Sequence, residues 1–255
     1  MYETIIIIPA RLGSTRLPRK LLLDLHGKPV LARTIAQAKK TTQIDQIFVA
    51  TDSLEIARIC QMEGVSYVMT RTECPNGTQR IAEAMKDIKA KRIINIQGDE
   101  PFIDPSLVDN IALELQTQHC HVVSAMSRIE RWENFVDTNT IKVVCDQQNC
   151  AMYFSRSPIP FLRDETIPNQ GEIPLETKLF AHIGVYGFSS DALLRYGNYQ
   201  ATPIEAQEKL EQLRMLYFGE KIKMLHHHKP SIGINTQRDL AAARQASKNL
   251  YNDKE

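Results

Sequence analysis

The sequence has no long apolar run, since none approaches the roughly 20 residues that a membrane-spanning helix needs. Its first residues, Met1 to Thr4, lack the basic start and small-residue cleavage site of a signal peptide. It also lacks charge of one dominant sign, with 31 Lys and Arg against 30 Asp and Glu and a formal net charge of +1. This balance disfavours a protein that binds nucleic acid through bulk positive charge. We expect a cytoplasmic protein that binds neither a nucleic acid nor a membrane.

Residue patterns for metal and redox chemistry are scarce. The five cysteines include no C-x-x-C pair, which disfavours a structural zinc site or a redox centre. Some of the seven histidines are grouped, at His119-x-His121 and at 226–228. Histidine runs define a metal site only if further ligands converge on them in space, and the sequence shows no such convergence. We interpret these histidines as surface residues near the ends of strands.

Strand and helix signals alternate through the first half of the chain. The predicted strands are 4–9, 46–51, 66–69 and 92–97, and the predicted helices are 29–40, 54–63, 79–89 and 105–116. Strands separated by helices of this length indicate a parallel sheet with helices on both faces. The predicted fold class is therefore α/β, with a mostly parallel Rossmann-like sheet flanked by helices. In such sheets, ligands bind beyond the carboxyl ends of the strands.

The middle of the chain has a different pattern. The segments 121–129, 140–146, 151–155 and 180–188 are strand-like, with few helical signals between them. They predict an antiparallel lobe at about residues 120–190, which is also a candidate subunit interface, and residues 162–178 are predicted to be a mobile loop. The α/β pattern returns with a helix at 203–218, a strand at 221–226 and a helix at 237–248. We therefore expect a single domain over residues 1–255 with the antiparallel lobe inserted in it.

A basic loop follows the first predicted strand. The segment PARLGSTRLPRK, residues 9–20, contains four cations and no carboxylate. It matches neither G-x-x-x-x-G-K-[ST] nor G-x-G-x-x-G, so a nicotinamide dehydrogenase is disfavoured. Gly13 and the hydroxyl residues beside it leave room for backbone N–H groups to bind phosphate, and the cations add charge. The loop predicts an anion site, and the alternative interpretation is a solvated basic turn.

Two further segments lie at the same predicted edge of the sheet. Gly98-Asp99-Glu100-Pro101 places a carboxylate after the fourth strand, where it is either a hard oxygen ligand for Mg²⁺ or a helix cap. Asn76-Gly77-Thr78 begins a predicted helix. Gly77 has no Cβ, so a ligand could approach the backbone closely there, although a turn and a cap would explain the segment as well.

With these segments in place, the sequence resembles the CMP-sugar synthetases of the nucleotidyltransferase superfamily. The shared blocks are P-A-R-x-x-S-x-R-L-P-x-K, G-K-P at 27–29, A-T-D at 50–52, N-G-T-x-R at 76–80 and Q-G-D-E-P at 97–101. Three later blocks narrow the resemblance to the 3-deoxy-manno-octulosonate cytidylyltransferases: Y-F-S-R-S-x-I-P at 153–160, H-I-G-V-Y at 182–186 and L-E-Q-L-R at 210–214. The resemblance extends from about residue 4 to residue 245.

The resemblance implies a reaction and a set of functional residues. Family members transfer CMP from CTP to the anomeric hydroxyl of 3-deoxy-D-manno-octulosonate (Kdo) for lipopolysaccharide synthesis, with Mg²⁺ as cofactor, and their antiparallel region forms a homodimer contact. The implied CTP-binding residues are Arg11, Arg16, Lys20, Gly77, Thr78, Arg80 and Gln97. The implied catalytic residues are Arg11, Lys20 and Asp99, with Asp99 and the position of Asn235 as metal ligands. The implied sugar-binding residues are Arg156, Arg163, His182, Tyr186, Glu211 and Gln212, an Arg or His being suited to the sugar carboxylate.

Three motifs depart from the family pattern. Where the family has R-L-P-G-K-P, this chain has Arg19 in place of the glycine and Leu21 in place of the last proline. Where the family has G-T-[E/D]-R, this chain has Gln79 at the acidic position. In place of the family's G-V-D-T-P-E-D, the chain has Asn235 where the second Mg²⁺-binding aspartate is expected. These changes make the site more positive, and we expect weaker or altered Mg²⁺ dependence.

Several explanations of these departures remain open. The chain could use a related 2-keto sugar acid of the amino-Kdo or sialate type, Arg19 could substitute for a cation, or the chain could be a non-catalytic paralogue. The intact acceptor-side residues His182, Tyr186 and Glu211 favour an active enzyme.

Overall fold

The computed structural model describes residues 1–14, 16–163 and 171–248. The chain divides into two compact units. The first unit comprises residues 1–113 and 231–255, and the second comprises residues 114–230.

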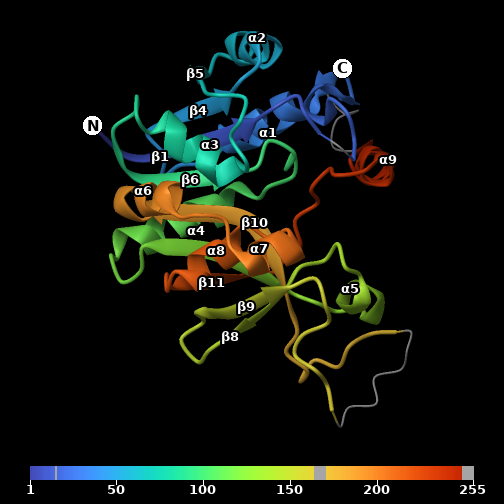
Figure 1. Cartoon of the computed structure of the whole chain (residues 1–255). Helices are drawn as coiled ribbons and strands as arrows, with labels where there is room; N and C mark the ends of the chain where they lie inside the picture. Colours follow the sequence, from blue (N-terminus) through green and yellow to red (C-terminus); the bar gives the residue numbers. More distant parts are fainter. Residues whose placement is uncertain (15, 164–170, 249–255) are drawn as a thin grey trace. The chain divides into compact units, whose positions relative to one another are not determined.

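The first unit contains a parallel sheet with the strand order β5–β4–β1–β6 (Figure 1). These strands are β1 (Tyr2–Ala10), β4 (Gln46–Thr51), β5 (Ser66–Met69) and β6 (Ala90–Ile96). Strand β1 pairs on both sides, and every residue from Thr4 to Ala10 is buried. A strand covered on both faces is apolar throughout, which explains the run from Ile5 to Ile8. The predicted α/β class is thus confirmed.

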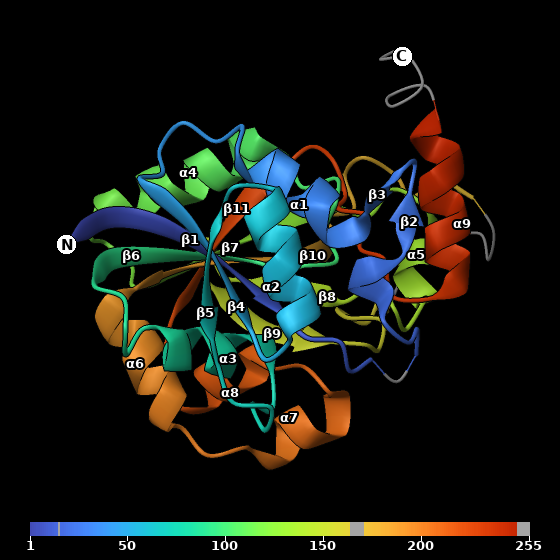
Figure 2. The same cartoon turned by 90° about the horizontal axis from the view of Figure 1, so that it is seen from above.

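The helices of the first unit begin largely where the sequence places them. They are α1 (Val30–Ala38), α2 (Leu54–Met62), α3 (Gly77–Ala84), α4 (Pro105–Gln116), which leads into the second unit, and α9 (Gln237–Ala246). A short 3₁₀ helix, η1 (Lys20–Leu22), precedes a small hairpin of β2 (Asp24–Leu25) and β3 (Lys28–Pro29). Helices α1 and α2 contact each other, and α2 packs on β4 and β5 (Figure 2).

Side-chain caps define several of these helix starts. Ser53, Asn76 and Thr236 each accept a hydrogen bond from a backbone N–H in the first turn of α2, α3 and α9 respectively.

Helix α3 was predicted to span 79–89, but it begins and ends earlier. Asn76 starts it at Gly77, and the chain has already entered β6 at Ala90.

The strand order creates a switch point beside β1. The chain passes from β1 outward to β4 and β5 and then returns to the other side of β1 as β6. The loops that follow β1 and β6 therefore leave the same edge of the sheet, on either side of the point at which the order reverses. Open α/β sheets bind ligands at this point. It is where the described residues of the basic loop, 9–14 and 16–20, meet residues 97–99.

The second unit is organised around β7. Its strands are β7 (Val122–Arg128), β8 (Lys142–Cys145), β9 (Ala151–Ser155), β10 (Phe180–Ser189) and β11 (Ile222–His227). Strand β7 pairs antiparallel with β10 and parallel with β11, and β8 pairs antiparallel with both β10 and β9. The register of β10 against β7 shifts between Ile183 and Tyr186. The predicted antiparallel region is therefore present, and its role as a dimer contact stays a prediction.

The helices of this unit differ from the prediction. They are α5 (Trp132–Val136), α6 (Ser190–Asn198), α7 (Pro203–Glu208) and α8 (Gln212–Tyr217). The single helix predicted over 203–218 is wrong, because Lys209 adopts a left-handed backbone with φ 55° and separates α7 from α8. Arg214 of α8 joins the two by donating to both carboxylate oxygens of Glu205, at 2.6 and 2.7 Å. Helix α5 is too short to show a periodic pattern.

The loop predicted at 162–178 is only partly within the described residues, because 164–170 lie outside them. Within the described part, Ile173 packs in a small apolar cluster with Ile129, Phe135 and Leu179.

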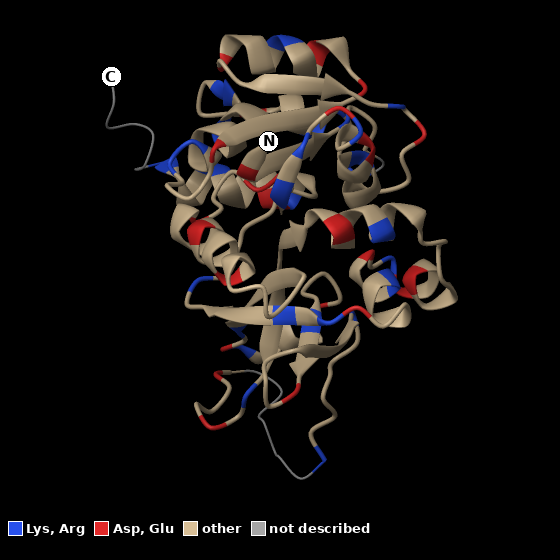
Figure 3. Ribbon diagram, turned by 90° about the vertical axis from the view of Figure 1, so that its left-hand side faces the viewer, with Lys and Arg blue, Asp and Glu red and all other residues tan. Residues whose placement is uncertain are grey.

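Charged residues of both signs are interspersed along the ribbon (Figure 3), in agreement with the formal net charge of +1. In the described parts of the chain, no helix has both the length and the apolar character needed to cross a membrane.

Candidate active site

A cavity of about 210 Å³ lies at the switch point of the first unit. It is lined by Pro9, Ala10, Arg11, Gly13, Ser14, Arg16, Lys20, Leu21, Asn76, Gly77, Arg80, Gln97, Gly98 and Asp99. Four of these lining residues are cations and one is a carboxylate. The cavity thus combines the predicted CTP-binding residues, except Thr78, with the predicted metal ligand Asp99. Its charge suits a polyanion.

The three cations of the basic loop that line the cavity have different surroundings. Arg11 is exposed and has no hydrogen-bond or ion-pair partner among the described residues. Arg16 donates to Oδ1 of Asn235 at 3.0 Å. Lys20 forms an ion pair with Asp99, and its Nζ also donates to Oδ1 of Asn235 at 3.2 Å. One amide oxygen therefore accepts hydrogen bonds from two cations of the loop.

Glu100 is a site residue that the sequence did not single out. The hydroxyl of Ser231 donates to its carboxylate, and burial together with the charge of Asp99 raises the pKa of Glu100 to about 7. A Cβ added at Gly233 would lie 2.7 Å from Oε1 of Glu100, so the Glu100 carboxylate would have to shift to admit any larger residue there. The backbone N–H of Ile234 donates to the carbonyl of Asp99 at 2.9 Å. These contacts hold the segment 231–235 against the end of β6.

The donor set at this point is compatible with Mg²⁺. An Asp99 carboxylate oxygen and the Asn235 amide oxygen both contact Nζ of Lys20, so the two oxygens converge on one place. Mg²⁺ prefers hard oxygen ligands and usually takes only one or two from protein, completing its shell with water and substrate phosphates. Over the described ranges, no group of three or more His, Cys, Asp and Glu side chains is arranged to hold a metal ion. These residues therefore suit a metal that binds together with phosphate.

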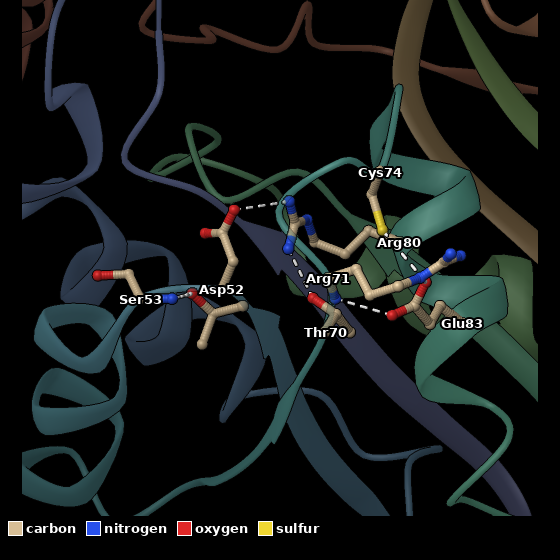
Figure 4. A network of polar contacts seen from close by, with 8 residues as sticks. Asp52, Ser53, Thr70, Arg71, Cys74, Arg80 and Glu83 are labelled. Atoms are coloured by element: carbon tan, nitrogen blue, oxygen red, sulfur yellow. Dashed lines mark hydrogen bonds and ion pairs between the residues drawn. The ribbon is translucent and has the colours of Figure 1, made fainter.

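Arg80 anchors the start of α3 beneath the cavity. Its side chain is 2% exposed and donates to Oγ1 of Thr70 at 2.5 Å and to Oδ2 of Asp52 at 3.1 Å. Figure 4 shows the guanidinium between these two side chains, which follow β5 and β4. On the next turn, Glu83 accepts from the backbone N–H and Nε of Arg71 at 2.7 and 2.8 Å. Because the buried charge of Arg80 is paired and hydrogen-bonded, it fixes α3 against both strands.

Gln97 is held by the buried side chains of Asn95 and Thr78. Its Nε2 donates to Oδ1 of Asn95 at 3.1 Å, and Nδ2 of Asn95 donates to Oγ1 of Thr78 at 3.3 Å. A Cβ added at Gly77 would lie 3.1 Å from Oε1 of Gln97 and 3.2 Å from Cγ of Pro9. Thr78 is fully buried, so it acts on the cavity through the position of Gln97.

Arg19 does not line the cavity. Its guanidinium pairs with Glu55 of α2 through N–O distances of 2.5 and 3.3 Å. Its backbone has φ 55°, a left-handed conformation that favours glycine. The backbone geometry explains the glycine of the family motif, and the contact with Glu55 explains how an arginine is accommodated there.

We expect Arg19→Ala to lower the free energy of unfolding by about 1 kcal/mol, because it removes the ion pair and keeps the left-handed strain. Arg19→Gly removes the pair and the strain together and should change stability by less than about 0.5 kcal/mol. Neither substitution should change the KM for CTP by more than about threefold. Urea denaturation and CTP kinetics of both variants measure these effects. A rise of about tenfold in the KM for CTP would instead show that Arg19 contacts the nucleotide.

Three of the predicted sugar-binding residues lie together in the second unit. Nε2 of His182 is 2.9 Å from Oγ of Ser124, and its ring centroid is 5.0 Å from that of Phe154 and 5.3 Å from that of Tyr186. Burial lowers the pKa of His182 to about 3, so the ring is neutral at physiological pH. Burial and the nearby charge of Glu211 raise the pKa of Tyr186.

The other predicted sugar-binding residues have different positions. Gln212 is buried in the first turn of α8. Arg156 donates to the carbonyls of Glu208 and Thr138, at 2.7 and 2.9 Å. Arg163 is exposed at the end of a described segment.

The fold and the cavity define the class, an α/β protein with a predominantly cationic cavity at the switch point of a parallel sheet. A family model for cytidylyltransferases matches residues 5–222. The chain is 40% identical over 248 residues to 3-deoxy-manno-octulosonate cytidylyltransferase of Neisseria meningitidis serogroup C, which covers 96% of this chain and 98% of that protein. The enzyme of the same name from Chlorobium phaeobacteroides is 40% identical over 251 residues, with 97% and 98% covered.

A solved structure of CMP:2-keto-3-deoxy-manno-octonic acid synthetase complexed with CTP is similar to this chain, with a TM-score of 0.88 and 31% identity. The similarity covers 97% of this chain and 99% of that one. The chain therefore belongs to the cytidylyltransferase family, within the 3-deoxy-manno-octulosonate cytidylyltransferases. The prediction of a nucleotidyltransferase is confirmed.

Proposed function

We propose that this enzyme transfers CMP from CTP to the anomeric hydroxyl of Kdo and releases pyrophosphate, providing CMP-Kdo for lipopolysaccharide synthesis. The main structural support is the cavity at the switch point, which has four cations and a single carboxylate in its described lining. Relatives of this chain along nearly its whole length are named for the same reaction.

Both reactants are anions, so repulsion and misorientation oppose the reaction. The anomeric hydroxyl attacks the α-phosphorus of CTP in line, and the bond to pyrophosphate breaks. Arg11, Arg16 and Lys20 bind the triphosphate and offset the charge that moves onto the leaving group. In this proposal Arg80 and Gln97 bind the nucleoside, and their hydrogen bonds to Asp52 and Asn95 limit their movement.

The proposed metal ligands are Asp99 and Asn235. When bound, Mg²⁺ would supply positive charge that offsets the negative charge developing on the phosphates. Glu100 and Ser231 keep the segment that contains Asn235 in position.

Asn235→Asp should lower the Mg²⁺ concentration for half-maximal rate by about tenfold, because it adds a charged oxygen where the wild-type offers an amide. Pyrophosphate release measured against Mg²⁺ concentration tests this expectation. Asn139→Asp, in an exposed turn of the second unit, is the matched control and should leave the metal curve unchanged. Identical curves for Asn235→Asp and wild-type would contradict Asn235 as a metal ligand.

We also propose that the protein is a cytoplasmic homodimer that uses the antiparallel region at about residues 120–190. Several large apolar side chains of this region are exposed, namely Met152, Tyr153, Phe161 and Leu175. Contact with a second copy would cover such side chains. Analytical ultracentrifugation of the full chain measures the oligomeric state, and a monomer at micromolar concentration would contradict this proposal.

The experiment that tests the proposed reaction is pyrophosphate release with CTP, Mg²⁺ or Mn²⁺, and a panel of 2-keto sugar acids. Turnover with Kdo supports the main proposal. Turnover only with an amino-Kdo or sialate-type acid would assign a related acceptor, and CTP binding without turnover on any acceptor would identify a non-catalytic paralogue.

A further inference from the structure

Ser124 lies at the centre of a small polar cluster in the second unit. It is a fully buried residue of β7, and its hydroxyl oxygen is 2.9 Å from Nε2 of His182. The same oxygen is 2.8 Å from the carbonyl of Val185 and 3.4 Å from that of Ile183. Two carbonyls of β10 reach one hydroxyl because the register of β10 shifts between Ile183 and Tyr186.

The hydroxyl of Ser124 has a single proton, and the bond that takes this proton determines which ring nitrogen of His182 is protonated. A serine hydroxyl has one proton to donate and lone pairs to accept with, whereas a carbonyl can only accept. The short distance to the Val185 carbonyl assigns the hydroxyl proton to that bond. The oxygen of Ser124 must then accept from His182, so the ring hydrogen is on Nε2.

We propose that Ser124 is a positioning residue that fixes His182 in the Nε2–H tautomer, so that the unprotonated Nδ1 accepts a hydrogen bond from a hydroxyl group of the sugar acid. This inference rests on the proposed function, because it assumes that His182 contacts the acceptor. Ser124 itself does not contact the substrate.

The surroundings of the ring agree with a neutral histidine. The rings of Phe154 and Tyr186 pack against it, and burial lowers the pKa of His182 to about 3. A neutral ring brings no positive charge to a carboxylate, so the sequence-based expectation that His182 suits the carboxylate is revised. An unprotonated ring nitrogen instead selects substrates with a hydroxyl in the matching position, because an analogue without it leaves the acceptor unpaired.

The tautomer can be measured directly by NMR on the full chain labelled with ¹⁵N-histidine. Long-range ¹H–¹⁵N spectra distinguish protonated from unprotonated ring nitrogens, and the spectrum of His182→Asn identifies the His182 signals. We expect a protonated Nε2 and an unprotonated Nδ1 at neutral pH. An Nδ1–H tautomer or an imidazolium in the wild-type protein would overturn the inference.

A Ser124 variant tests whether the tautomer of His182 affects binding of the sugar acid. In Ser124→Ala, Nε2–H has no hydroxyl to donate to, so the Nδ1–H form should increase and the KM for the sugar acid should rise by about tenfold. The KM for CTP should stay within about twofold of wild-type. The matched control is Ser127→Ala, which alters another buried serine of β7 and should leave both the spectrum and the KM for the sugar acid unchanged.

Acceptors that each lack one hydroxyl complete the test. The wild-type enzyme should bind one of these deoxy analogues more weakly, and Ser124→Ala should lose that discrimination. Equal discrimination by both proteins would overturn the inference. Failure to transfer CMP to any sugar acid would instead contradict the proposed function, while the NMR spectra would still decide whether Ser124 sets the tautomer.

Discussion

Asp99→Asn should lower kcat for CMP transfer by about 10³-fold. Asp99 is the single carboxylate among the described residues that line the cavity, and it is the partner of Lys20. The second proposed metal ligand, Asn235, is already uncharged, so this substitution leaves the metal without a charged protein ligand. The loss of kcat should therefore be larger than in a site where two carboxylates bind the metal and only one is removed.

Initial rates of pyrophosphate release at several Mg²⁺ concentrations measure this effect. Asp109→Asn is the control, because Asp109 lies on α4 and accepts from the backbone N–H groups of Thr42 and Gln43 at 2.9 and 3.0 Å. In the double variant Asp99→Asn with Asn235→Asp, one carboxylate returns to the site, and part of the activity should return with it. Activity of Asp99→Asn within about tenfold of wild-type would rule out Asp99 as the main metal ligand.

Lys20→Ala should lower kcat by about 10²- to 10³-fold, because a cation at the triphosphate stabilises charge that develops during the transfer. The side chain also joins the basic loop to Asp99 and Asn235, so its removal leaves Asp99 without its ion-pair partner. Lys20→Arg keeps the charge but changes its geometry and should recover only part of the rate.

Separate values of kcat and KM for CTP distinguish transition-state stabilisation from simple binding. Lys28→Ala is the matched control, since its ammonium group pairs with Glu63 at 3.2 Å and does not line the cavity. A higher KM with unchanged kcat would show that Lys20 contributes only to binding.

The sequence predicted the parallel sheet and the position of the cavity because both follow from local patterns. The alternation of apolar strands with helices determines the α/β class, and the basic loop follows directly on the run from Ile5 to Ile8. The carboxyl ends of neighbouring parallel strands meet at one edge, so the loop and Asp99 could be placed together before the structure was known.

Features that depend on distant contacts or on backbone dihedrals could not be predicted in this way. The charge of Arg19 suggested that its side chain binds phosphate. The local sequence pattern shows neither its left-handed backbone nor its contact with Glu55, which is 36 residues away. Glu100 gains its role from Ser231, which is 131 residues distant. The break at Lys209 was missed because helical signals continue on both sides of it.

The pairing of the cations in the cavity has a consequence for the kinetics of nucleotide capture. Arg80 is neutralised by Asp52 and Lys20 by Asp99, whereas the exposed Arg11 and Arg16 have no carboxylate partner in the described chain. Interactions between exposed charges act over about 10 Å at moderate salt, and they accelerate the encounter of oppositely charged molecules. Arg11 and Arg16 should thus govern the association rate of CTP and its sensitivity to ionic strength, while the paired cations determine how long the nucleotide stays bound.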